Sequence, residues 1–447
     1  MPRMFKLTRA TYRKLPVDLR RWLAGKGIPD ALARWLLAFG LRRGSAAANS
    51  PHTALYRSMV ERAGRGLAAI APASPPQDAT PPPGTQGPRL IAWYLPQYHP
   101  TPDNDRFWGE GFTDWHNVAK AVPQFAGHQQ PRRPATLGYY DLRLEETMVR
   151  QVEMARAHGL TAFAFHYYAF GHRRALEKPL DLFLANASGR LDMNFVLSWA
   201  NENWTRRWDG RETAVLIRQT NDPEALEAVF AGMRRYLADP RYLRVDGRPL
   251  LIVYRPAQVA NLSATMLRWR AMAVEAGLGG LYLVATDAFT LAGDEAHAFD
   301  AVCRFPPHGA ALDPANHEQC ILNPDFRGTI YRYGDLVELE RQRLDTRTAR
   351  DDGRAYFPGV MPGWDNEARR PGRGTVFAGA TPKLYASWLD HALRASQRLN
   401  PPDRQFVFIN AWNEWAEGAY LEPDMDNGFA YLAATGEALA SLSSPGC

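Results

Sequence analysis

The sequence predicts an α/β fold, a (β/α)8 TIM barrel preceded by a small, basic, helical N-terminal extension. Two observations predict the barrel. Eight apolar runs with the length of buried parallel strands are present, and segments of helical periodicity lie between many of them. Eight strands favour closure into a barrel over an open, doubly wound sheet. No glycine-rich phosphate loop follows the first run, which disfavours a dinucleotide-binding fold.

Composition divides the 447 residues into three parts. Residues 1–70 are predicted to be a basic, amphipathic, helical extension. Residues 71–88, APASPPQDATPPPGTQGP, are too poor in large apolar side chains to fold and are predicted to be a linker. Residues 89–447 contain all eight runs and are predicted to form the barrel, with a hydrophobic content of 46% over the whole chain that allows a large core.

The candidate strands are short runs rich in β-branched and aromatic residues, and the run near residues 357–361 is the weakest. Asp222 and Thr381 are of types that cap helix N-termini, and each precedes a helix-period segment. The predicted strands are Leu90–Leu95, Thr161–Tyr167, Asn194–Trp199, Leu250–Tyr254, Leu281–Ala285, Ala301–Phe305, Phe357–Met361 and Phe406–Asn410. The predicted helices include Glu145–His158, Pro223–Ala238, Ser263–Ala276 and Pro382–Leu399.

Positive charge is concentrated at the N-terminus. Residues 1–43 hold eleven Lys and Arg against Asp18 and Asp30, while the whole chain has a net charge of +6. Nucleic acid is not expected as a partner, because its binding needs cations grouped along a folded face. Two interpretations of residues 1–43 stay open: interfacial helices in peripheral contact with an anionic membrane surface, or a small helical cap with a solvated basic face.

The chain is expected to be cytoplasmic, with contact at the inner face of the membrane as an open addition. No stretch reaches the roughly 20 apolar residues of a membrane span. The N-terminus lacks the order of basic region, apolar core and cleavage site that a signal peptide has. The three cysteines have no metal-type spacing, which fits a reducing compartment.

Glu414 and Glu417 are the predicted catalytic residues. In FVFINAWNEWAEGAYLEP, residues 406–423, an apolar run leads into these two carboxylates, and catalytic groups of barrels lie at strand ends. Glycoside cleavage commonly uses two carboxyl groups, and residues three apart on a helical turn lie close enough to act together. The alternative is that both are the acidic first turn of the last helix, where carboxylates favour the positive helix end.

The other strand ends are rich in aromatic, amide and carboxylate side chains. Sugars stack their C–H faces on Trp and Tyr, and their hydroxyls bind Asn, Asp, Glu and His. No metal and no cofactor are expected, because the histidines lack ligand spacing. The predicted substrate-binding residues are Tyr94, Gln97, Tyr98, His99, His166, Tyr167, Tyr168, Trp199, Asn201, Glu202, Asn203, Trp204, Tyr254, Asp287, Trp364, Asp365, Asn366, Asn410, Trp412 and Asn413.

From about Pro88 to Asp424 the chain resembles the glycoside hydrolase family 99-like proteins, also called the WbsX type, of polysaccharide biosynthesis. The resemblance rests on IAWYLPQYHP, WGEGFTDWHNV, AFHYYAF, LSWANENWTRRW, MPGWDN and INAWNEWAEGAYLEPD. It implies a barrel like that of the retaining endo-α-mannosidases, with Glu414 as general base on the sugar 2-hydroxyl and Glu417 as general acid and base. Ala416 stands where the mannosidases carry His, so the exact substrate is not implied.

The expected function is that of a carbohydrate-active enzyme on a bacterial surface polysaccharide or its precursor. Retaining, endo-type hydrolysis is the leading expectation, and an oligosaccharide or polysaccharide is the expected partner. Two alternatives stay open. One is a glycosyltransferase or transglycosylase of lipopolysaccharide O-antigen or capsule biosynthesis, and the other is a noncatalytic carbohydrate-binding protein.

Overall fold

The computed structural model describes residues 50–66, 87–206, 211–287, 293–348 and 354–443. The chain divides into two compact units, Met1–Gly64 with Phe125–Gly127 and Arg65–Gln124 with His128–Cys447. In the first unit, the described helix is α4 (Pro51–Gly64), which has no buried residue. Residues 1–43 and most of the predicted linker lie outside the described residues, so the predicted domain boundaries stay predictions.

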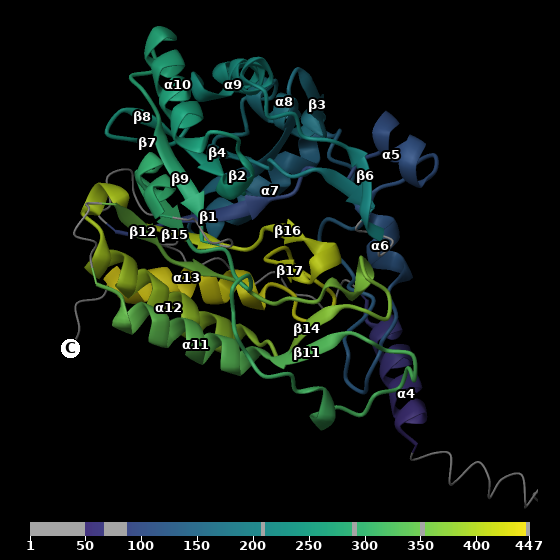
Figure 1. Cartoon of the computed structure of the whole chain (residues 1–447). Helices are drawn as coiled ribbons and strands as arrows, with labels where there is room; N and C mark the ends of the chain where they lie inside the picture. Colours follow the sequence, from purple (N-terminus) through teal and green to yellow (C-terminus); the bar gives the residue numbers. More distant parts are fainter. Residues whose placement is uncertain (1–49, 67–86, 207–210, 288–292, 349–353, 444–447) are drawn as a thin grey trace, which may run out of the picture. The chain divides into compact units, whose positions relative to one another are not determined.

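Parallel strands form a nearly closed ring in the second unit, and the predicted (β/α)8 barrel is confirmed (Figure 1). From β1 the ring runs through β2, β4, β8, β9 and β10 to β12, and on its other side β1 pairs with β15. The seventh position holds two short strands, because β12 pairs with β10 while β13 pairs with β15. The ring consists of β1 (Arg89–Tyr94), β2 (Leu160–Phe170), β4 (Asn194–Trp199), β8 (Arg248–Val253), β9 (Tyr282–Thr286), β10 (Ala301–Cys303), β12 (Ala355–Phe357), β13 (Gly359–Val360) and β15 (Phe406–Ile409).

The seam of the ring explains why its seventh run was the weakest in the sequence. Pro358 interrupts the strand because it has no N–H to donate, although its carbonyl accepts from Phe408 N at 2.9 Å. A Cβ on Gly359 would overlap the carbonyl oxygen of Arg304, so only glycine fits at this close approach of two strands. The seventh position is therefore split at two residues that usually weaken a strand.

The strands form the centre of the hydrophobic core. Every residue of β9 and of β15 is buried. A parallel strand that is covered on both faces has a nearly continuous apolar sequence, which is the pattern that predicted these strands. The sixth strand ends earlier than predicted, at Cys303, shortly before Pro306 and Pro307, which cannot donate to a ladder.

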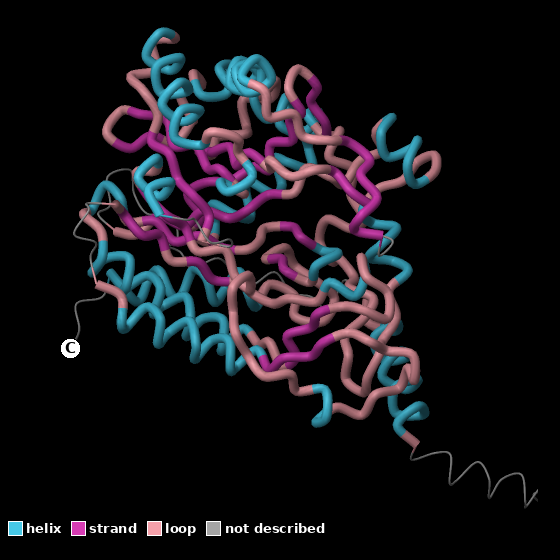
Figure 2. Tube along the Cα trace, in the orientation of Figure 1, coloured by secondary structure: helices cyan, strands magenta, loops and turns pink. Residues whose placement is uncertain are grey.

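Helices cover the outside of the ring (Figure 2). Both predicted caps are confirmed, because Asp222 accepts from Ala225 N at 2.9 Å and Thr381 accepts from Leu384 N at 3.2 Å. No helix among the described residues is long and apolar enough to cross a bilayer. The helices are α7 (Glu145–Ala157), α8 (Glu177–Ala185), α9 (Pro223–Leu237), α10 (Leu262–Glu275), α11 (Tyr333–Thr346), α12 (Pro382–Leu399) and α13 (Ala430–Ser443).

Short elements fill the connections between strands and helices, and several of them surround the carboxyl ends of the strands. Three small antiparallel or parallel pairs stand apart from the ring: β5 with β6, β11 with β14, and β16 with β17. The short elements are α5 (Pro102–Trp108), α6 (Asp114–Lys120), β3 (Arg173–Ala175), β5 (Trp204–Arg206), β6 (Arg211–Ile217), β7 (Arg244–Val245), η3 (Pro256–Gln258), η4 (Gly293–Ala298), η5 (Asn316–Glu318), β11 (Thr329–Arg332), η6 (Asn366–Ala368), β14 (Thr375–Ala378), η7 (Pro402–Arg404), β16 (Asn413–Glu414), η8 (Trp415–Glu417) and β17 (Ala419–Tyr420).

Candidate active site

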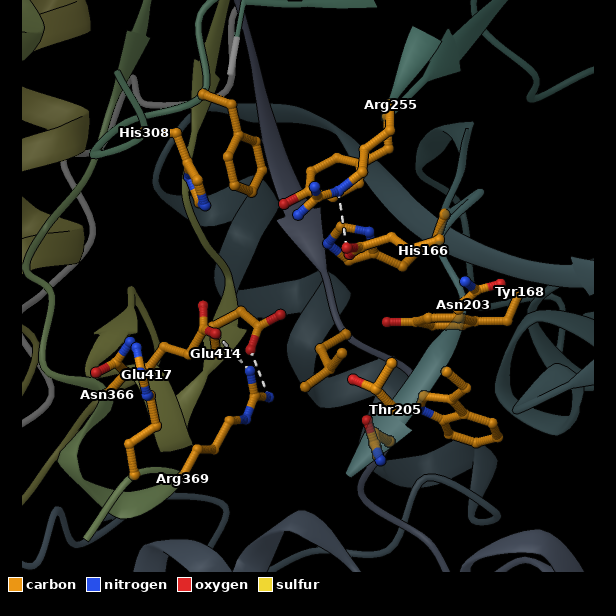
Figure 3. A pocket seen from close by; sticks show the side chains of 18 of the residues that line it. His166, Tyr168, Asn203, Thr205, Arg255, His308, Asn366, Arg369, Glu414 and Glu417 are labelled. Carbon is orange, nitrogen blue, oxygen red and sulfur yellow. Dashed lines mark hydrogen bonds and ion pairs between the residues drawn. The ribbon is translucent and has the colours of Figure 1, made fainter. Parts of the chain in front are cut away.

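A cavity of about 360 Å³ opens at the carboxyl ends of the barrel strands. Its volume lies at the lower end of the range for small-ligand pockets. Figure 3 shows Glu414, Glu417 and Arg369 on one side of the cavity, with Tyr168 and Thr205 on the other. The lining residues are Leu95, Gln97, His166, Tyr168, Phe170, Ala200, Glu202, Asn203, Trp204, Thr205, Tyr254, Arg255, Phe305, His308, Trp364, Asn366, Arg369, Arg370, Glu414 and Glu417.

A tight hairpin after β15 carries the two glutamates. Glu414 ends β16 and pairs with Ala419 of β17, and the 3-10 turn η8 between these strands contains Glu417. Gly418 ends the turn with φ of 61°, and a Cβ there would lie 2.8 Å from the Asp365 Cβ. The last helix, α13, begins only at Ala430. The alternative interpretation of the glutamates as the first turn of the last helix is therefore wrong.

Arg369 joins the two glutamates through one guanidinium. Its Nη2 lies 2.9 Å from Glu414 Oε2, and its Nη1 lies 2.7 Å from Glu417 Oε1. The arginine side chain is 10% exposed, so these ion pairs are largely shielded from water. Because the terminal nitrogens of a guanidinium are rigid neighbours, both carboxylates are held on the same wall of the cavity.

A third carboxylate anchors the arginine from behind. Asp114, the first residue of α6, accepts from Arg369 Nη2 at 2.6 Å and from Arg369 Nε at 3.2 Å. Its other oxygen accepts from Asn117 Nδ2 at 2.8 Å. Asp114 is fully buried, so its charge is compensated by these contacts rather than by water.

Burial raises the pKa of Glu414 above its usual value, and Arg369 opposes this shift. Glu417 and Asp114 add to the rise, because nearby negative charges disfavour a further ionised carboxylate. A buried carboxyl group with a raised pKa in a cavity is a candidate functional group.

The family model described as "Glycosyltransferase WbsX" matches residues 90–435. The chain belongs to the WbsX family. This confirms the resemblance to the WbsX type that the motifs indicated. Two uncharacterized proteins WxcX, from two strains of Xanthomonas campestris pv. campestris, are each 44% identical to the chain over 350 residues, which are 78% of this chain and 49% of theirs. The WbsX-family chain therefore spans about half the length of these curated relatives.

Solved glycoside hydrolase structures share the barrel of the WbsX-family chain. The GH99 endo-alpha-mannosidase from Bacteroides thetaiotaomicron is 14% identical with a TM-score of 0.50, and the match covers 80% of this chain and 98% of that one. A glycoside hydrolase-like protein is 14% identical with a TM-score of 0.53, and that match covers 84% and 99%. At such low identity, these likenesses show the fold alone.

Strand alternation separates the predicted residues of β2. His166 and Tyr168 line the cavity, whereas Tyr167 points to the opposite face and packs near Tyr236, with ring centroids 6.1 Å apart. Burial, together with the positive charge of Arg369, lowers the pKa of His166 to about 4, so this imidazole is neutral at neutral pH.

The end of β4 divides in a similar way. Glu202, Asn203 and Trp204 line the cavity, and Glu202 Oε2 lies 2.7 Å from Arg255 Nε. The Trp204 ring stacks on Tyr168 with centroids 6.1 Å apart, forming an aromatic wall opposite the glutamates.

Trp199 and Asn201 lie outside the lining because both are used structurally. Trp199 packs on Trp269 behind the strand, with ring centroids 5.0 Å apart. The side-chain amide of Asn201 binds the backbone of Arg255 twice, accepting from its N and donating to its O, each at 2.7 Å. It thereby positions the loop that carries the Arg255 side chain.

Four residues were predicted at the end of β1, and of these only Gln97 lines the cavity. Tyr94 faces outward and donates to Gln151 Oε1 at 2.7 Å. The Tyr98 hydroxyl accepts from Trp415 N at 3.0 Å and so supports the hairpin that carries Glu414 and Glu417. His99 is buried away from the lining, and burial lowers its pKa to about 4.

Tyr254, Trp364 and Asn366 line the cavity, whereas Asp365 and Asp287 do not. The Asp365 side chain is enclosed by His128 and Gln130, with oxygen to nitrogen distances of 2.8 and 2.7 Å. Asp287 follows β9 as an exposed residue outside the lining.

Three predicted residues after β15 belong to the scaffold. Asn410 donates to Pro306 O at 2.7 Å, and Trp412 packs on Phe163 with ring centroids 5.2 Å apart. Asn413 accepts from Leu95 N at 2.7 Å and donates to Leu95 O at 3.0 Å, tying the hairpin to the first strand. For the residues that do line the cavity, a substrate-binding role stays a prediction.

Arg369 and Asp114 were not among the predicted site residues. Arg369 follows the MPGWDN motif by three residues, and Asp114 lies in the WGEGFTDW segment. Two consecutive arginines beside a carboxylate-rich motif were the available signal, because gathered carboxylates require a cation when they are buried. Among the described residues, no group of three or more His, Cys, Asp or Glu is arranged to hold a metal ion.

Proposed function

We propose that this WbsX-family chain is a carbohydrate-active enzyme that acts on a glycosidic bond of a bacterial surface polysaccharide or its precursor. One observation carries the proposal: Glu414 and Glu417 share one guanidinium in an aromatic-walled cavity at the strand ends of a (β/α)8 barrel. This is the usual location of active sites in this fold. The proposed reaction is endo-type hydrolysis with retained configuration.

The proposed roles follow the family 99 resemblance. Glu414 takes the proton of the sugar 2-hydroxyl while the 2-oxygen attacks the anomeric carbon, and Glu417 gives its proton to the leaving oxygen as that bond breaks. An anhydro-sugar results. Glu417, now ionised, then takes a proton from water as the water oxygen opens the anhydro ring, and Glu414 returns its proton to the 2-oxygen. Two inversions leave the configuration unchanged.

The geometry supports a close pair of carboxyl groups. The inverting mechanism needs a gap of about 6.5–9.5 Å for a water between the carboxyl groups, whereas retaining enzymes keep them at about 5–5.5 Å. Ion pairs of 2.9 and 2.7 Å to neighbouring nitrogens of Arg369 favour the closer arrangement. Across the cavity, the stacked rings of Tyr168 and Trp204 offer an apolar surface to a sugar face.

Glycosyl transfer is the second candidate, and the description of the matching family as a glycosyltransferase favours it. The same two glutamates serve this reaction if a sugar hydroxyl replaces water in the second step. The donor is then a glycoside that the first step can cleave, and the acceptor hydroxyl loses its proton to Glu417. The first step is identical for hydrolysis and transfer.

The deciding experiment incubates the protein with oligosaccharides prepared from bacterial surface polysaccharides, with and without nucleotide sugars. Mass spectrometry of the products separates the candidates. Shortened products support hydrolysis, and lengthened products support transfer. Binding without any change in the glycan overturns the enzymatic proposal in favour of a carbohydrate-binding protein.

The matched control is Glu338→Gln, which removes an exposed carboxylate on α11. Its activity is expected to equal that of the unchanged protein. The test variant is the double variant Glu414→Gln/Glu417→Gln. If it is as active as this control, the assigned site is wrong.

A further inference from the structure

We propose that Arg369 and Asp114 form a positioning pair. Arg369 fixes the positions of Glu414 and Glu417 relative to each other, and Asp114 partly neutralises the positive charge that Arg369 presents to them. The inference rests on the proposed function for its catalytic meaning. Its physical content concerns only the charges of four described side chains.

The contacts assign a different nitrogen to each glutamate. Arg369 Nη2 binds Glu414 at 2.9 Å, and Nη1 binds Glu417 at 2.7 Å. A guanidinium is planar and its donors form a rigid fork, so a change in its orientation would move both carboxylates together. A lysine ammonium keeps the charge but lacks this fixed geometry.

Asp114 competes with the glutamates for the same cation. It accepts from Nη2, the nitrogen that also binds Glu414, and from Nε. The side-chain amide of Asn117 donates to the other oxygen of this carboxylate and holds it in place. One guanidinium therefore faces three carboxylates, and its charge cannot fully neutralise all of them.

The same cavity also contains His166, His308, Glu202, Arg255 and Arg370. Two tyrosines interact with Glu414 as well. Tyr98 and Tyr168 each sense the charge of Glu414, and burial raises the pKa of both phenols, so they are neutral in the working pH range. The largest charge effects on the pKa of Glu414 come from Arg369, Glu417 and Asp114.

The two members of the pair act on the protonation of Glu414 in opposite directions. Arg369 lowers the pKa of Glu414, and Asp114 raises it. Without Asp114, the guanidinium charge of Arg369 also acts more strongly on the glutamates, which lowers the pKa of Glu414 further. A purely structural role predicts no such opposition, because loosening the loop from either side would have the same kind of effect.

The test compares Asp114→Asn with the double variant Arg369→Met/Asp114→Asn in the full chain. Both avoid leaving Asp114 buried as an unpaired charge, which would endanger folding. The readout is the pH titration of the Glu414 carboxyl carbon by NMR, assigned by its absence in Glu414→Gln. We expect the midpoint to fall by about one pH unit or more in Asp114→Asn and to rise in the double variant, relative to the unchanged protein.

Arg270→Met/Asp300→Asn is the matched control. It removes an ion pair of 2.7 Å near the amino end of the barrel strands and is expected to leave the Glu414 midpoint unchanged. Arg369→Lys tests the fixed geometry of the guanidinium donors. The titration midpoint of Glu414 is expected to stay within about half a pH unit because the positive charge remains. Turnover of any cleaved oligosaccharide is expected to fall at least tenfold because the fixed geometry is lost.

Equal midpoints in the two Asp114 variants, or shifts in the same direction, overturn the positioning pair. The titration is read without substrate, so it succeeds or fails independently of the enzymatic proposal. If the midpoints move as expected while no glycan is altered, the proposed function fails and the positioning pair stands.

Discussion

At the scale of single residues, the two glutamates are close together because an arginine lies between them. Glu414 and Glu417 would repel each other as neighbouring anions in a buried wall, and Arg369 compensates for this through one donor to each. The motif predicts the pair, but its cation comes from a loop 45 residues earlier in the chain. Chemistry at this site therefore depends on a contact that the motif does not contain.

Glu417→Gln is expected to remove most of the turnover while glycan binding persists. The amide fits the same space and still accepts from Arg369, but it can neither give a proton to the leaving oxygen nor take one from water. General acid and base catalysis typically contributes a factor of about 10²–10⁴, so a loss of at least about a hundredfold is expected. Turnover and binding are measured on the same oligosaccharide, and unchanged turnover would remove the acid and base assignment.

Glu422 is a buried carboxyl group that supports the hairpin carrying Glu414 and Glu417. It accepts from Trp415 Nε1 at 2.6 Å, from Gln151 Nε2 at 2.6 Å and from the Tyr140 hydroxyl at 2.8 Å. Burial raises its pKa to about 7 although these donors act to lower it. The group lies behind Trp415 and outside the cavity lining, so its titration concerns stability.

Glu422→Gln is expected to flatten the pH dependence of stability. Because the folded-state pKa of Glu422 is about 7 and the ordinary value is 4.5, the folded protein binds more protons between these values. Its stability therefore falls as the pH rises through this window, by about 3 kcal/mol at most, and stays constant above it. Urea denaturation from pH 4 to 8 measures this. Equal slopes for the variant and the unchanged protein would contradict the expectation.

At the scale of elements, the hairpin of β16, η8 and β17 decides the direction of the glutamates. Its turn closes through Gly418, whose positive φ disfavours other residues. A Cβ added there would lie 2.8 Å from the Asp365 Cβ and 3.0 Å from the Asp365 N. The sequence predicts a helical spacing for Glu414 and Glu417. In the structure these residues lie in a single 3-10 turn, with Glu414 preceding η8 and Glu417 ending it.

Gly418→Ala is expected to lose both stability and turnover. The strained φ costs about 1–2 kcal/mol, and the added Cβ also forces the Asp365 loop away from the hairpin. Gly379→Ala is the matched control, because Gly379 has φ of 82° and a Cβ added there would meet no atom within 4 Å. Urea denaturation and turnover are measured for both, and only Gly418→Ala is expected to lose turnover. Equal turnover in the two variants would contradict the role of the hairpin.

Strand parity explains which predicted residues line the cavity. Consecutive residues of a strand point to opposite faces, so His166 and Tyr168 share the inner face while Tyr167 lies outside. After the strands end, parity no longer applies, and amides such as Asn201 and Asn413 bind backbone groups instead. Residue type identified the right strand ends but could not assign each side chain to cavity or scaffold.

At the scale of the whole molecule, positive charge is concentrated in the N-terminal residues. Residues 1–43 lie outside the described residues, and their charge is the basis for expecting contact with anionic lipid. The full chain is expected to sediment with anionic vesicles at low salt and less so at high salt, because exposed charges are screened within about 10 Å at 0.1 M ionic strength. Neutral vesicles are the control. Equal sedimentation after deletion of residues 1–43 would favour the helical cap.

The sequence by itself determined the barrel, because strands buried on both faces must be continuously apolar, and it determined the carboxylate pair at the end of the last strand. The tertiary structure alone decided what surrounds that pair. Arg369 reaches Glu414 from another loop, and Asp114 of α6 binds Arg369. Such contacts between distant segments leave no periodic signal in the chain. Burial, which raises the pKa of Glu414, is likewise a property of the assembled barrel.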